Sequence, residues 1–394
     1  MSIINSILDN DLYKFTMQQF VLHNFNNVEV EYDLSIRSDV DLRSYKLDIA
    51  VAISNLQFLK LTSDEDCYLR NLRFLSEDYV DWLYNFKFNP EEEVRVTEKD
   101  GQLAITIKGL WINTILYEVP ILAIISEIYH KKNDLKEQSN WYHTTVEARN
   151  RLVKKYNYAE DISSDGFHFA DFGTRRRHSR ENQDKVISEL YGISPVTFVG
   201  TSNVHFAMKH RLTPIGTMAH EVIMAAQALL PLPTHQKDIL YLWAKEFKGD
   251  LGIALSDTLG SKKFFEDFTA DLAKMFDGVR HDSGDPEDFA KETIMHYKKL
   301  GIDPMTKTIV FSDSLDLVKA KRLFDKFKSK IKISFGIGTN LTNDCDGIKP
   351  LSIVIKMQMC NGMPVVKISD TPEKAMCRNK NYLEFMKEHV NGES

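Results

Sequence analysis

The stretch Gly278-Val279-Arg280-His281-Asp282-Ser283-Gly284-Asp285-Pro286 indicates how the second part of the chain folds. A short apolar run ends in a polar turn, and Pro286 then opens a segment with helical periodicity that extends to Leu300. The same succession recurs from Phe167 onward. We therefore expect strands at residues 167–172, 196–199, 214–216, 252–255, 278–279, 308–311 and 332–335.

Strands and helices that alternate in this way form a parallel sheet with crossover helices, either an open α/β sheet or a (β/α) barrel. Small, polar or charged residues follow nearly every expected strand, as in Gly173-Thr174-Arg175 and Ser312-Asp313-Ser314. In a barrel such turns meet at one face, where active sites lie. We therefore predict an α/β barrel over residues 151–349, with helices at residues 181–191, 220–230, 262–276, 286–300 and 314–327.

The first 150 residues have a different pattern and predict an α+β domain. Residues 28–35 and 94–109 alternate like half-buried strands, and residues 64–86 and 117–135 have helical periodicity. In the C-terminal tail, two strand-like runs flank the turn Asn361-Gly362-Met363-Pro364. We expect this tail, residues 350–394, to return to the N-terminal sheet and complete that domain.

Composition limits the classes of function. The 394 residues carry a net charge of −6, which argues against a nucleic-acid-binding protein that works by bulk electrostatics. Arginines inside one cleft can still bind phosphate. The four cysteines are scattered and lack the spacing of a zinc or redox site, so we expect a reduced, cytoplasmic protein.

Nothing in the sequence predicts targeting to a membrane. Residues 1–12 lack a basic segment followed by an apolar run, so we do not expect a signal peptide. The longest apolar stretch, near residues 120–125, is far shorter than the roughly 20 residues of a membrane-spanning helix. We expect a protein without a membrane partner.

The stretch Gly216-Thr217-Met218-Ala219-His220-Glu221 places a histidine just beyond an expected strand end. A single histidine is more often structural than catalytic, but at a barrel mouth an imidazole can act as base, metal ligand or phosphoryl acceptor. Asp257 ends the next expected strand. It should therefore lie beside His220 and could hold its other ring N–H.

Two further turns are candidates for binding anions and sugars. Gly336-Ile337-Gly338-Thr339-Asn340 could expose backbone N–H groups to a phosphate, although a plain turn explains it equally well. In Arg280-His281-Asp282-Ser283-Gly284, Arg280 could hold a carboxylate or phosphate, and Asp282 could bind sugar hydroxyls or Mg2+. Capping of the helix that starts at Pro286 explains only part of this turn.

Thr174-Arg175-Arg176-Arg177-His178-Ser179 holds the densest positive charge in the chain. Three adjacent arginines repel one another unless anions are near, which favours a phosphate or pyrophosphate pocket. A solvated surface turn is the alternative.

Three motifs resemble those of the nicotinate phosphoribosyltransferases, and the resemblance extends along essentially the whole chain. They are Asp9-Asn10-Asp11-Leu12-Tyr13-Lys14-Phe15-Thr16-Met17, Phe169-Ala170-Asp171-Phe172-Gly173-Thr174-Arg175-Arg176-Arg177 and Gly216-Thr217-Met218-Ala219-His220-Glu221. The resemblance implies the irregular α/β barrel of the type II phosphoribosyltransferases, packed against an α+β domain that the C-terminal tail completes.

The resemblance also implies a reaction. Nicotinate and 5-phosphoribosyl 1-pyrophosphate would give nicotinate mononucleotide and pyrophosphate, the first step of NAD salvage from nicotinate. Mg2+ would be required, and ATP hydrolysis would be coupled through a phosphohistidine that matches His220. The metal ligands are not assigned.

The resemblance further implies a homodimer with shared active sites, in which Tyr13 stacks on the pyridine from the other subunit. Phe172 matches the stacking partner on the opposite face, and Arg175, Thr217 and Arg280 match positions that contact nicotinate or its phosphate. From the turns, we assign phosphate or ribose binding to Arg176, Asp282, Ser283, Asp313, Gly336, Gly338 and Thr339.

Several other functions are compatible with these residues. A nicotinamide phosphoribosyltransferase has a similar barrel and histidine, but the arginine-rich motif and the short chain resemble the nicotinate enzymes more closely. A quinolinate-using enzyme is disfavoured because no decarboxylating signature is present. A metal-dependent barrel hydrolase or aldolase could use Asp282, Asp257 and His220, and a metabolite-binding protein without activity is the last alternative.

Overall fold

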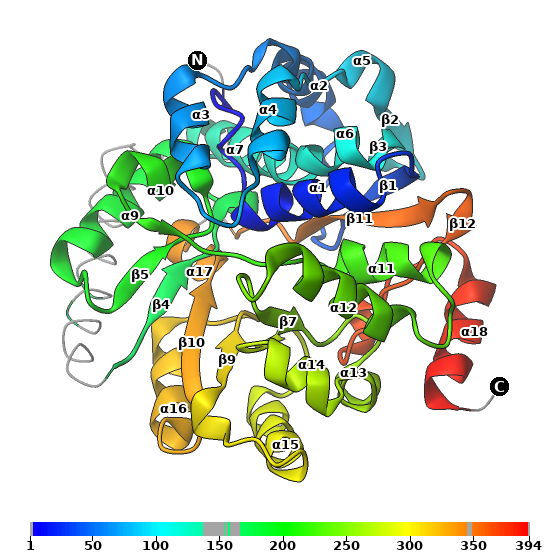
Figure 1. Ribbon diagram of the computed structural model, residues 1–394. Helices are drawn as coiled ribbons and strands as arrows, with labels where there is room; N and C mark the ends of the chain where they lie inside the picture. The colour runs from blue at the N-terminus through cyan, green and yellow to red at the C-terminus, as the bar shows by residue number, and fades with distance from the viewer. Residues whose placement is uncertain (1–2, 137–153, 155–156, 158–165, 345–348, 393–394) are drawn as a thin grey trace.

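The computed structural model describes residues 3–136, 154, 157, 166–344 and 349–392. Two sheets organise them (Figure 1). One is a seven-stranded parallel sheet with the order β6-β5-β4-β10-β9-β8-β7, and the other is a five-stranded antiparallel sheet with the order β12-β11-β1-β3-β2. The expected boundary near residue 150 lies outside the described residues.

All seven strands expected in the second part of the chain are present. They are β4 (Phe169–Asp171), β5 (Phe198–Thr201), β6 (Thr213–Pro214), β7 (Ile253–Leu255), β8 (Gly278–His281), β9 (Thr308–Phe311) and β10 (Lys332–Ile337). Each pairs in parallel with its neighbours. The barrel is irregular because β6 and β7 are the two edges of the sheet, and the hydroxyl of Thr217 donates to the carbonyl of Ile253 at 2.9 Å across them.

Helices follow these strands as predicted, with one correction. They are α9 (Arg180–Ile193), α10 (Val204–His210), α11 (His220–Leu229), α12 (His235–Phe247), α13 (Ser261–Asp267), α14 (Ala270–Met275), α15 (Pro286–Lys299), α16 (Leu317–Phe327) and α17 (Thr339–Thr342). The single helix expected over residues 262–276 is two helices. Thr269 is extended and is the N-cap residue of the second helix, although its side chain makes no capping hydrogen bond; threonine is less favourable in a helix interior than at an N-cap.

The expectation that the C-terminal tail joins the N-terminal sheet is confirmed. The central strand β1 (Glu29–Ile36) pairs with β11 (Ile353–Cys360) on one side and with β3 (Gln102–Leu110) on the other. The hairpin partner of β3 is β2 (Val94–Lys99), and β12 (Met363–Pro364) follows β11. Asn361 and Gly362 both have positive φ, 46° and 75°, as a two-residue hairpin turn requires.

The remaining helices belong to the N-terminal part of the chain, except the last, which belongs to the tail. They are α1 (Leu12–Asn24), α2 (Lys46–Ser54), α3 (Ser63–Arg70), α4 (Glu77–Asn85), α5 (Pro90–Glu93), α6 (Trp111–Thr114), α7 (Glu118–Lys136) and α18 (Lys380–Asn391). Short 3-10 turns occupy Arg43–Tyr45, Asn55–Phe58, Ile115–Tyr117, Thr174–Arg176, Pro304–Thr306 and Pro372–Lys374. The helix expected over residues 64–86 is therefore split into α3 and α4, and Ser76 is the extended N-cap of α4.

One helical segment is longer than the apolar stretch seen in the sequence. Trp111–Asn133 is long and apolar enough to cross a membrane, which corrects the length expected above. However, 89% of its most apolar window is buried inside the protein, which is typical of a core helix. Helix α1 is also enclosed, because every residue from Leu12 to Val21 is buried. The N–H of Leu12 donates to the carbonyl of Ser202 at 2.8 Å, and the hydroxyl of Thr16 donates to the carbonyl of Thr217 at 2.6 Å, so α1 links the N-terminal part to the barrel.

Candidate active site

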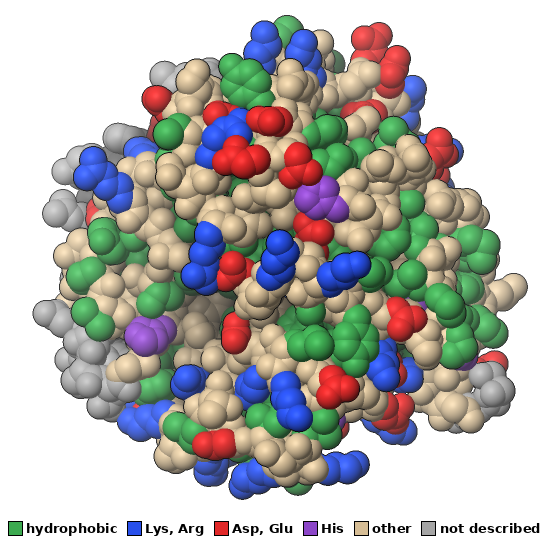
Figure 2. Space-filling view, viewed as in Figure 1, with side chains coloured by type: hydrophobic (Ala, Val, Ile, Leu, Met, Phe, Trp, Pro, Cys, Tyr) green, Lys and Arg blue, Asp and Glu red, His purple; other side chains and the backbone are tan. Residues whose placement is uncertain are grey.

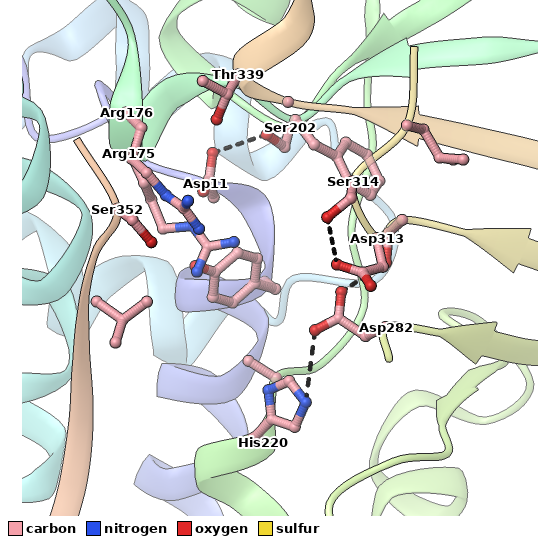
Figure 3. A pocket seen from close by; sticks show the side chains of 18 of the residues that line it. Asp11, Arg175, Arg176, Ser202, His220, Asp282, Asp313, Ser314, Thr339 and Ser352 are labelled. Carbon is pink, nitrogen blue, oxygen red and sulfur yellow. Dashed lines mark hydrogen bonds and ion pairs between the residues drawn. The ribbon is translucent and has the colours of Figure 1, made fainter. Parts of the chain in front are cut away.

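A cavity of about 570 Å³ opens at the carboxyl ends of the parallel strands. Turns after β4, β5, β6, β8, β9 and β10 line it, together with the start of α1, strand β11 and the tail that follows β12. In Figure 3, Arg175 and Arg176 lie on one side of the cavity and Asp282 and Asp313 lie on the other, while His220 lies below Asp282, with its Nε2 3.5 Å from Oδ2 of Asp282. Residues far apart in the sequence therefore meet at one site.

Most of the residues predicted from the sequence line this cavity. They are Tyr13, Phe172, Arg175, Arg176, His220, Arg280, Asp282, Asp313, Gly338 and Thr339. Four predicted residues lie outside its lining because they contact other parts of the chain: Asp257, Thr217, Ser283 and Gly336.

Asp257 lies directly behind His220, as expected. Its Oδ1 is 2.9 Å from Nε2 of His220, and both side chains are buried. Because β6 and β7 are opposite edges of the sheet, this contact depends on the curling of the sheet and not on strand pairing. Within the described part of the chain, Nδ1 of His220 has no hydrogen-bond partner, so it is the nitrogen available to a ligand in the cavity.

Ser283 and Lys367 complete the surroundings of Asp257. The hydroxyl of Ser283 donates to Oδ2 of Asp257 at 2.6 Å, and Nζ of Lys367 lies 2.9 Å from the same oxygen. Burial opposes ionisation of Asp257, but His220, Lys367 and Ser283 lower its pKa well below the usual value. Asp257 is therefore ionised, and Nε2 of His220 must carry the proton of their hydrogen bond. Ser283 contacts the aspartate and not the cavity.

The imidazole of His220 is neutral at physiological pH. Burial and the charge of Lys367 lower its pKa to about 4, and Asp257 opposes this shift only in part. A neutral ring with its proton on Nε2 has a lone pair on Nδ1. The site thus presents a nucleophilic nitrogen to the cavity.

Thr217 and Gly336 shape the barrel instead of lining the cavity. The hydroxyl of Thr217 joins the two edge strands, as described above, and its carbonyl accepts from Thr16 at 2.6 Å. A Cβ atom on Gly336 would lie 2.2 Å from Cδ2 of Phe172. The phosphate-binding role expected for Gly336 is therefore corrected: its missing side chain makes room for the ring of Phe172.

The three consecutive arginines have different environments. Arg177 is fully buried and donates to both carboxylate oxygens of Asp9, at 2.7 and 2.9 Å, so it is structural. Arg175 and Arg176 line the cavity, and Arg175 lies 3.6 Å from Glu118. Among the described residues, no carboxylate lies within ion-pair distance of Arg176; burial and the charges of Arg175 and Arg37 lower its pKa to about 10. A surface turn is therefore the wrong interpretation.

The cavity is positively charged although the chain is negatively charged. On the face shown in Figure 2, basic and acidic side chains are interspersed. In the cavity, basic side chains clearly outnumber the four carboxylates Asp11, Glu118, Asp282 and Asp313. The basic side chains are Arg37, Arg175, Arg176, Arg280, Lys319, Lys356, Lys367 and Lys374. Such a cavity favours an anionic ligand.

The sequence did not predict the three tail lysines, Lys356, Lys367 and Lys374. Lys356 is on β11, Lys367 contacts Asp257, and Nζ of Lys374 lies 2.6 Å from Asp313. The return of the tail to the N-terminal sheet was predicted, but its pairing with β1 and the position of that sheet beside the barrel mouth were not. No local signal in the tail distinguishes these lysines from solvated ones.

Tyr13 requires a correction. The resemblance implied that its ring enters the site from a second subunit, but Tyr13 and Phe172 line the same cavity of one chain. Tyr13 is only 8% exposed, and it begins the buried helix α1. A single chain therefore brings both aromatic residues to the site.

Two groups of side chains could hold a metal ion. Atoms of His220, Asp257 and Asp282 lie within 4.8 Å of one another. This group fits a transition metal poorly, because Lys367 and Ser283 occupy one oxygen of Asp257 and His220 donates to the other. Asp282 and Asp313 follow neighbouring strands and offer oxygen ligands, which suit Mg2+. Burial opposes ionisation of Asp282, but Arg280 lowers its pKa to about 2.

Known proteins resemble the chain along nearly all of its length. The model of the nicotinate phosphoribosyltransferase (NAPRTase) N-terminal domain matches residues 8–126, and that of the nicotinate phosphoribosyltransferase (NAPRTase) family matches residues 167–393. A nicotinate phosphoribosyltransferase of Ectopseudomonas mendocina is 46% identical over 98% of this chain and 96% of its own.

Solved structures agree with the sequence matches. The crystal structure of nicotinate phosphoribosyltransferase from Vibrio cholerae superposes with a TM-score of 0.91 at 40% identity, covering 99% of this chain and 94% of that one. The nicotinate phosphoribosyltransferase of Porphyromonas gingivalis gives 0.91 at 34% identity, covering 99% and 100%. The chain belongs to the nicotinate phosphoribosyltransferase family.

Proposed function

We propose that the chain transfers the phosphoribosyl group of 5-phosphoribosyl 1-pyrophosphate to nicotinate, and that it couples this transfer to ATP hydrolysis through a phosphorylated His220. The products are nicotinate mononucleotide and pyrophosphate, and the step begins NAD salvage from nicotinate in the cytoplasm. The observation that carries the proposal is the pair His220–Asp257, which presents a neutral imidazole nitrogen to a cationic cavity.

In the transfer step, the bond from ribose C1 to pyrophosphate breaks, and pyrophosphate leaves with the electron pair. The pyridine nitrogen forms the new bond to C1. Tyr13 and Phe172 provide aromatic walls for the pyridine, and Arg175 with Arg280 provides positive charge for its carboxylate or for the phosphate. Positioning of two reactants can contribute about 7 kcal/mol or more in favourable cases.

The leaving pyrophosphate gathers negative charge that the site must neutralise. Mg2+, when bound with the substrate, supplies part of this charge neutralisation, and Asp282 and Asp313 would hold it. Arg176 and the tail lysines surround the same space. Gly338 and Thr339 at the start of α17 offer backbone N–H groups to the ribose phosphate.

In the coupling step, the lone pair on Nδ1 of His220 attacks the γ-phosphorus of ATP. The phosphorus–oxygen bond to ADP breaks, and ADP leaves with the electron pair. Asp257 stabilises the ring while Nδ1 carries the phosphoryl group, because Nε2 keeps its proton and donates to the carboxylate. Water later attacks phosphorus, the electron pair returns to Nδ1, and inorganic phosphate leaves.

One assay tests the proposal. Pyrophosphate release is measured with phosphoribosyl pyrophosphate and Mg2+, with nicotinate or nicotinamide as acceptor, and with or without ATP. We expect release with nicotinate that ATP accelerates. Preference for nicotinamide would indicate the other phosphoribosyltransferase, and absence of release with either acceptor would overturn the proposed reaction.

The homodimer stays a prediction from the family resemblance. Because one chain supplies both Tyr13 and Phe172, the proposed reaction does not require a second subunit to complete this aromatic pair. Sedimentation of the active enzyme at assay concentration measures its oligomeric state.

A further inference from the structure

Three charged side chains are buried together at the edge of the cavity: Lys14 of α1, Glu118 at the start of α7 and Glu221 in the first turn of α11. Nζ of Lys14 is 2.7 Å from Oε2 of Glu118 and also pairs with Oε2 of Glu221. None of the three is more than 5% exposed. A buried ion pair contributes little net stability, because the desolvation of its charges can exceed their attraction, so stability alone does not explain the triad.

Each member of this triad adjoins a residue that lines the cavity. Lys14 follows Tyr13, and Glu221 follows His220. Glu118 lines the cavity itself, and its Oε1 faces Arg175 at 3.6 Å and Lys356 at 4.0 Å. The triad therefore connects the end of the cavity at Arg175 with the helix that carries His220.

Glu221 also anchors that helix. Its Oε1 accepts from the hydroxyl of Tyr32 at 3.2 Å and from Nε1 of Trp111 at 3.0 Å. The first turn of α11 is thus held by Lys14, Tyr32 and Trp111, which all belong to the N-terminal part of the chain. A change in the ion pair between Lys14 and Glu221 would therefore act directly on the residue next to His220.

Glu118 is placed to cause such a change. Among the described residues, its buried Oε1 has no hydrogen-bond partner, and Arg175 at 3.6 Å is too distant to provide one. Although burial opposes ionisation, Lys14, Lys356 and Arg175 lower the pKa of Glu118 to about 2. An anion bound to Arg175 would compete with Glu118 for the charge of Arg175. Lys14 would then neutralise more of the negative charge of Glu118 and less of that of Glu221.

We propose that Glu118, Lys14 and Glu221 are positioning residues that make phosphorylation of His220 depend on the anion bound at Arg175. The proposal rests on the function proposed above. It adds how binding of nicotinate, the acceptor of the phosphoribosyl group, affects the phosphorylation of His220. None of the three residues needs to touch a reacting atom for this role.

The test compares wild type with Glu118→Gln, which keeps the shape of the side chain and removes its charge. ATP hydrolysis is measured with and without saturating nicotinate. In wild type we expect nicotinate to change the ATPase rate about fivefold or more, as a typical coupling between sites would. In Glu118→Gln the ratio of the two rates should move toward one, while ATPase activity persists.

A merely structural role would lower both rates together and leave their ratio unchanged, and that result would overturn the proposal. Glu221→Gln should shift the ratio in the same direction. Glu246→Gln is the matched control, because Glu246 also links α1 to a barrel helix, through Gln19 and His23, but does not line the cavity. Its ratio should equal that of wild type.

Amide hydrogen exchange of residues 220–229 provides a readout that does not depend on ATP hydrolysis. Nicotinate should change exchange in the first turn of α11 in wild type and not in Glu118→Gln. If wild type hydrolyses no ATP, the proposed coupling reaction is wrong. A difference between the exchange responses of the two proteins would still support a link through the triad from Arg175 to α11. Equal exchange responses in the two proteins would reject the triad whatever the ATPase result.

Discussion

Nε2 of His220 donates to Oδ1 of Asp257 at 2.9 Å, and this bond decides which ring nitrogen can react. Asp257 is ionised and has Lys367 and Ser283 on its other oxygen, so it cannot supply the proton itself. Nδ1 is left with its lone pair toward the cavity.

His220→Asn should abolish ATP hydrolysis and the stimulation of transfer by ATP, while slow ATP-independent transfer remains. Asparagine lacks the nucleophilic nitrogen but does not disturb the binding of the pyridine by the aromatic walls. Phosphate release and nucleotide formation, measured side by side, check this. His210→Asn is the control, because His210 pairs with Asp184 outside the cavity. Stimulation by ATP in the His220 variant would refute the proposed role.

Asp257→Asn should slow phosphorylation of His220 by about 10- to 100-fold, because a hydrogen bond to a charged group contributes about 1.5–3 kcal/mol. The substitution also leaves Lys367 without its carboxylate. Rapid-quench measurement of phosphohistidine formation tests the effect. An unchanged rate would remove Asp257 from the mechanism.

The phosphorylation step should be insensitive to pH between about 5.5 and 7.5, where an ordinary histidine titrates. The reactive form is neutral, and the pKa of His220 is lowered to about 4, so protonation inactivates the ring only well below the usual pH. Lys367→Met removes a charge that lowers this pKa. In the pH–rate profile of this variant, the fall in rate at acid pH should therefore occur at a higher pH than in wild type. An unchanged profile would contradict the assignment of this fall to His220.

Gly336→Ala should weaken nicotinate binding, because the new Cβ would lie 2.2 Å from Cδ2 of Phe172 and must displace the ring. Overpacking of this kind costs about 1–3 kcal/mol, so we expect the KM for nicotinate to rise about tenfold. Gly192→Ala is the control, since nothing lies within 4 Å of its added Cβ. A normal KM in the Gly336 variant would show that Phe172 does not hold the pyridine.

Asp9→Ala should destabilise the fold by about 3–5 kcal/mol, because it leaves the buried guanidinium of Arg177 without its hydrogen-bonded carboxylate and with only Glu127, at 3.9 Å, as a counter-charge. Denaturant unfolding gives the free energy of unfolding directly. Asp41→Ala breaks the exposed pair with Arg43 and should have little effect. Equal effects of the two substitutions would show that burial of the Arg177 pair is energetically unimportant.

Local patterns in the chain were enough to predict several features. The seven parallel strands follow from short apolar runs, and their turns follow from the polar residues that end each run. The hairpin turn in the tail follows from the residues Asn361 and Gly362, which both have positive φ. These features depend on neighbours in sequence, where periodicity and turn chemistry act directly.

The sequence could not predict which of the three arginines line the cavity, because they are adjacent and have the same side chain. Arg175, Arg176 and Arg177 are consecutive, yet only the first two line the cavity, because the 3-10 turn Thr174–Arg176 directs the third to Asp9. The role of Gly336 under Phe172 also depends on a contact that no local pattern reports.

Local patterns along the chain are enough to give the order of strands and helices, the polar turns at the strand ends and the motif that contains His220. Which of these residues meet depends on how distant segments pack. The sheet curls so that its edges β6 and β7 bring His220 to Asp257, and the tail contributes Lys367 to the same pair. Periodicity reports which side of an element is buried, whereas the pKa of His220 depends on charges brought to it by packing of distant segments.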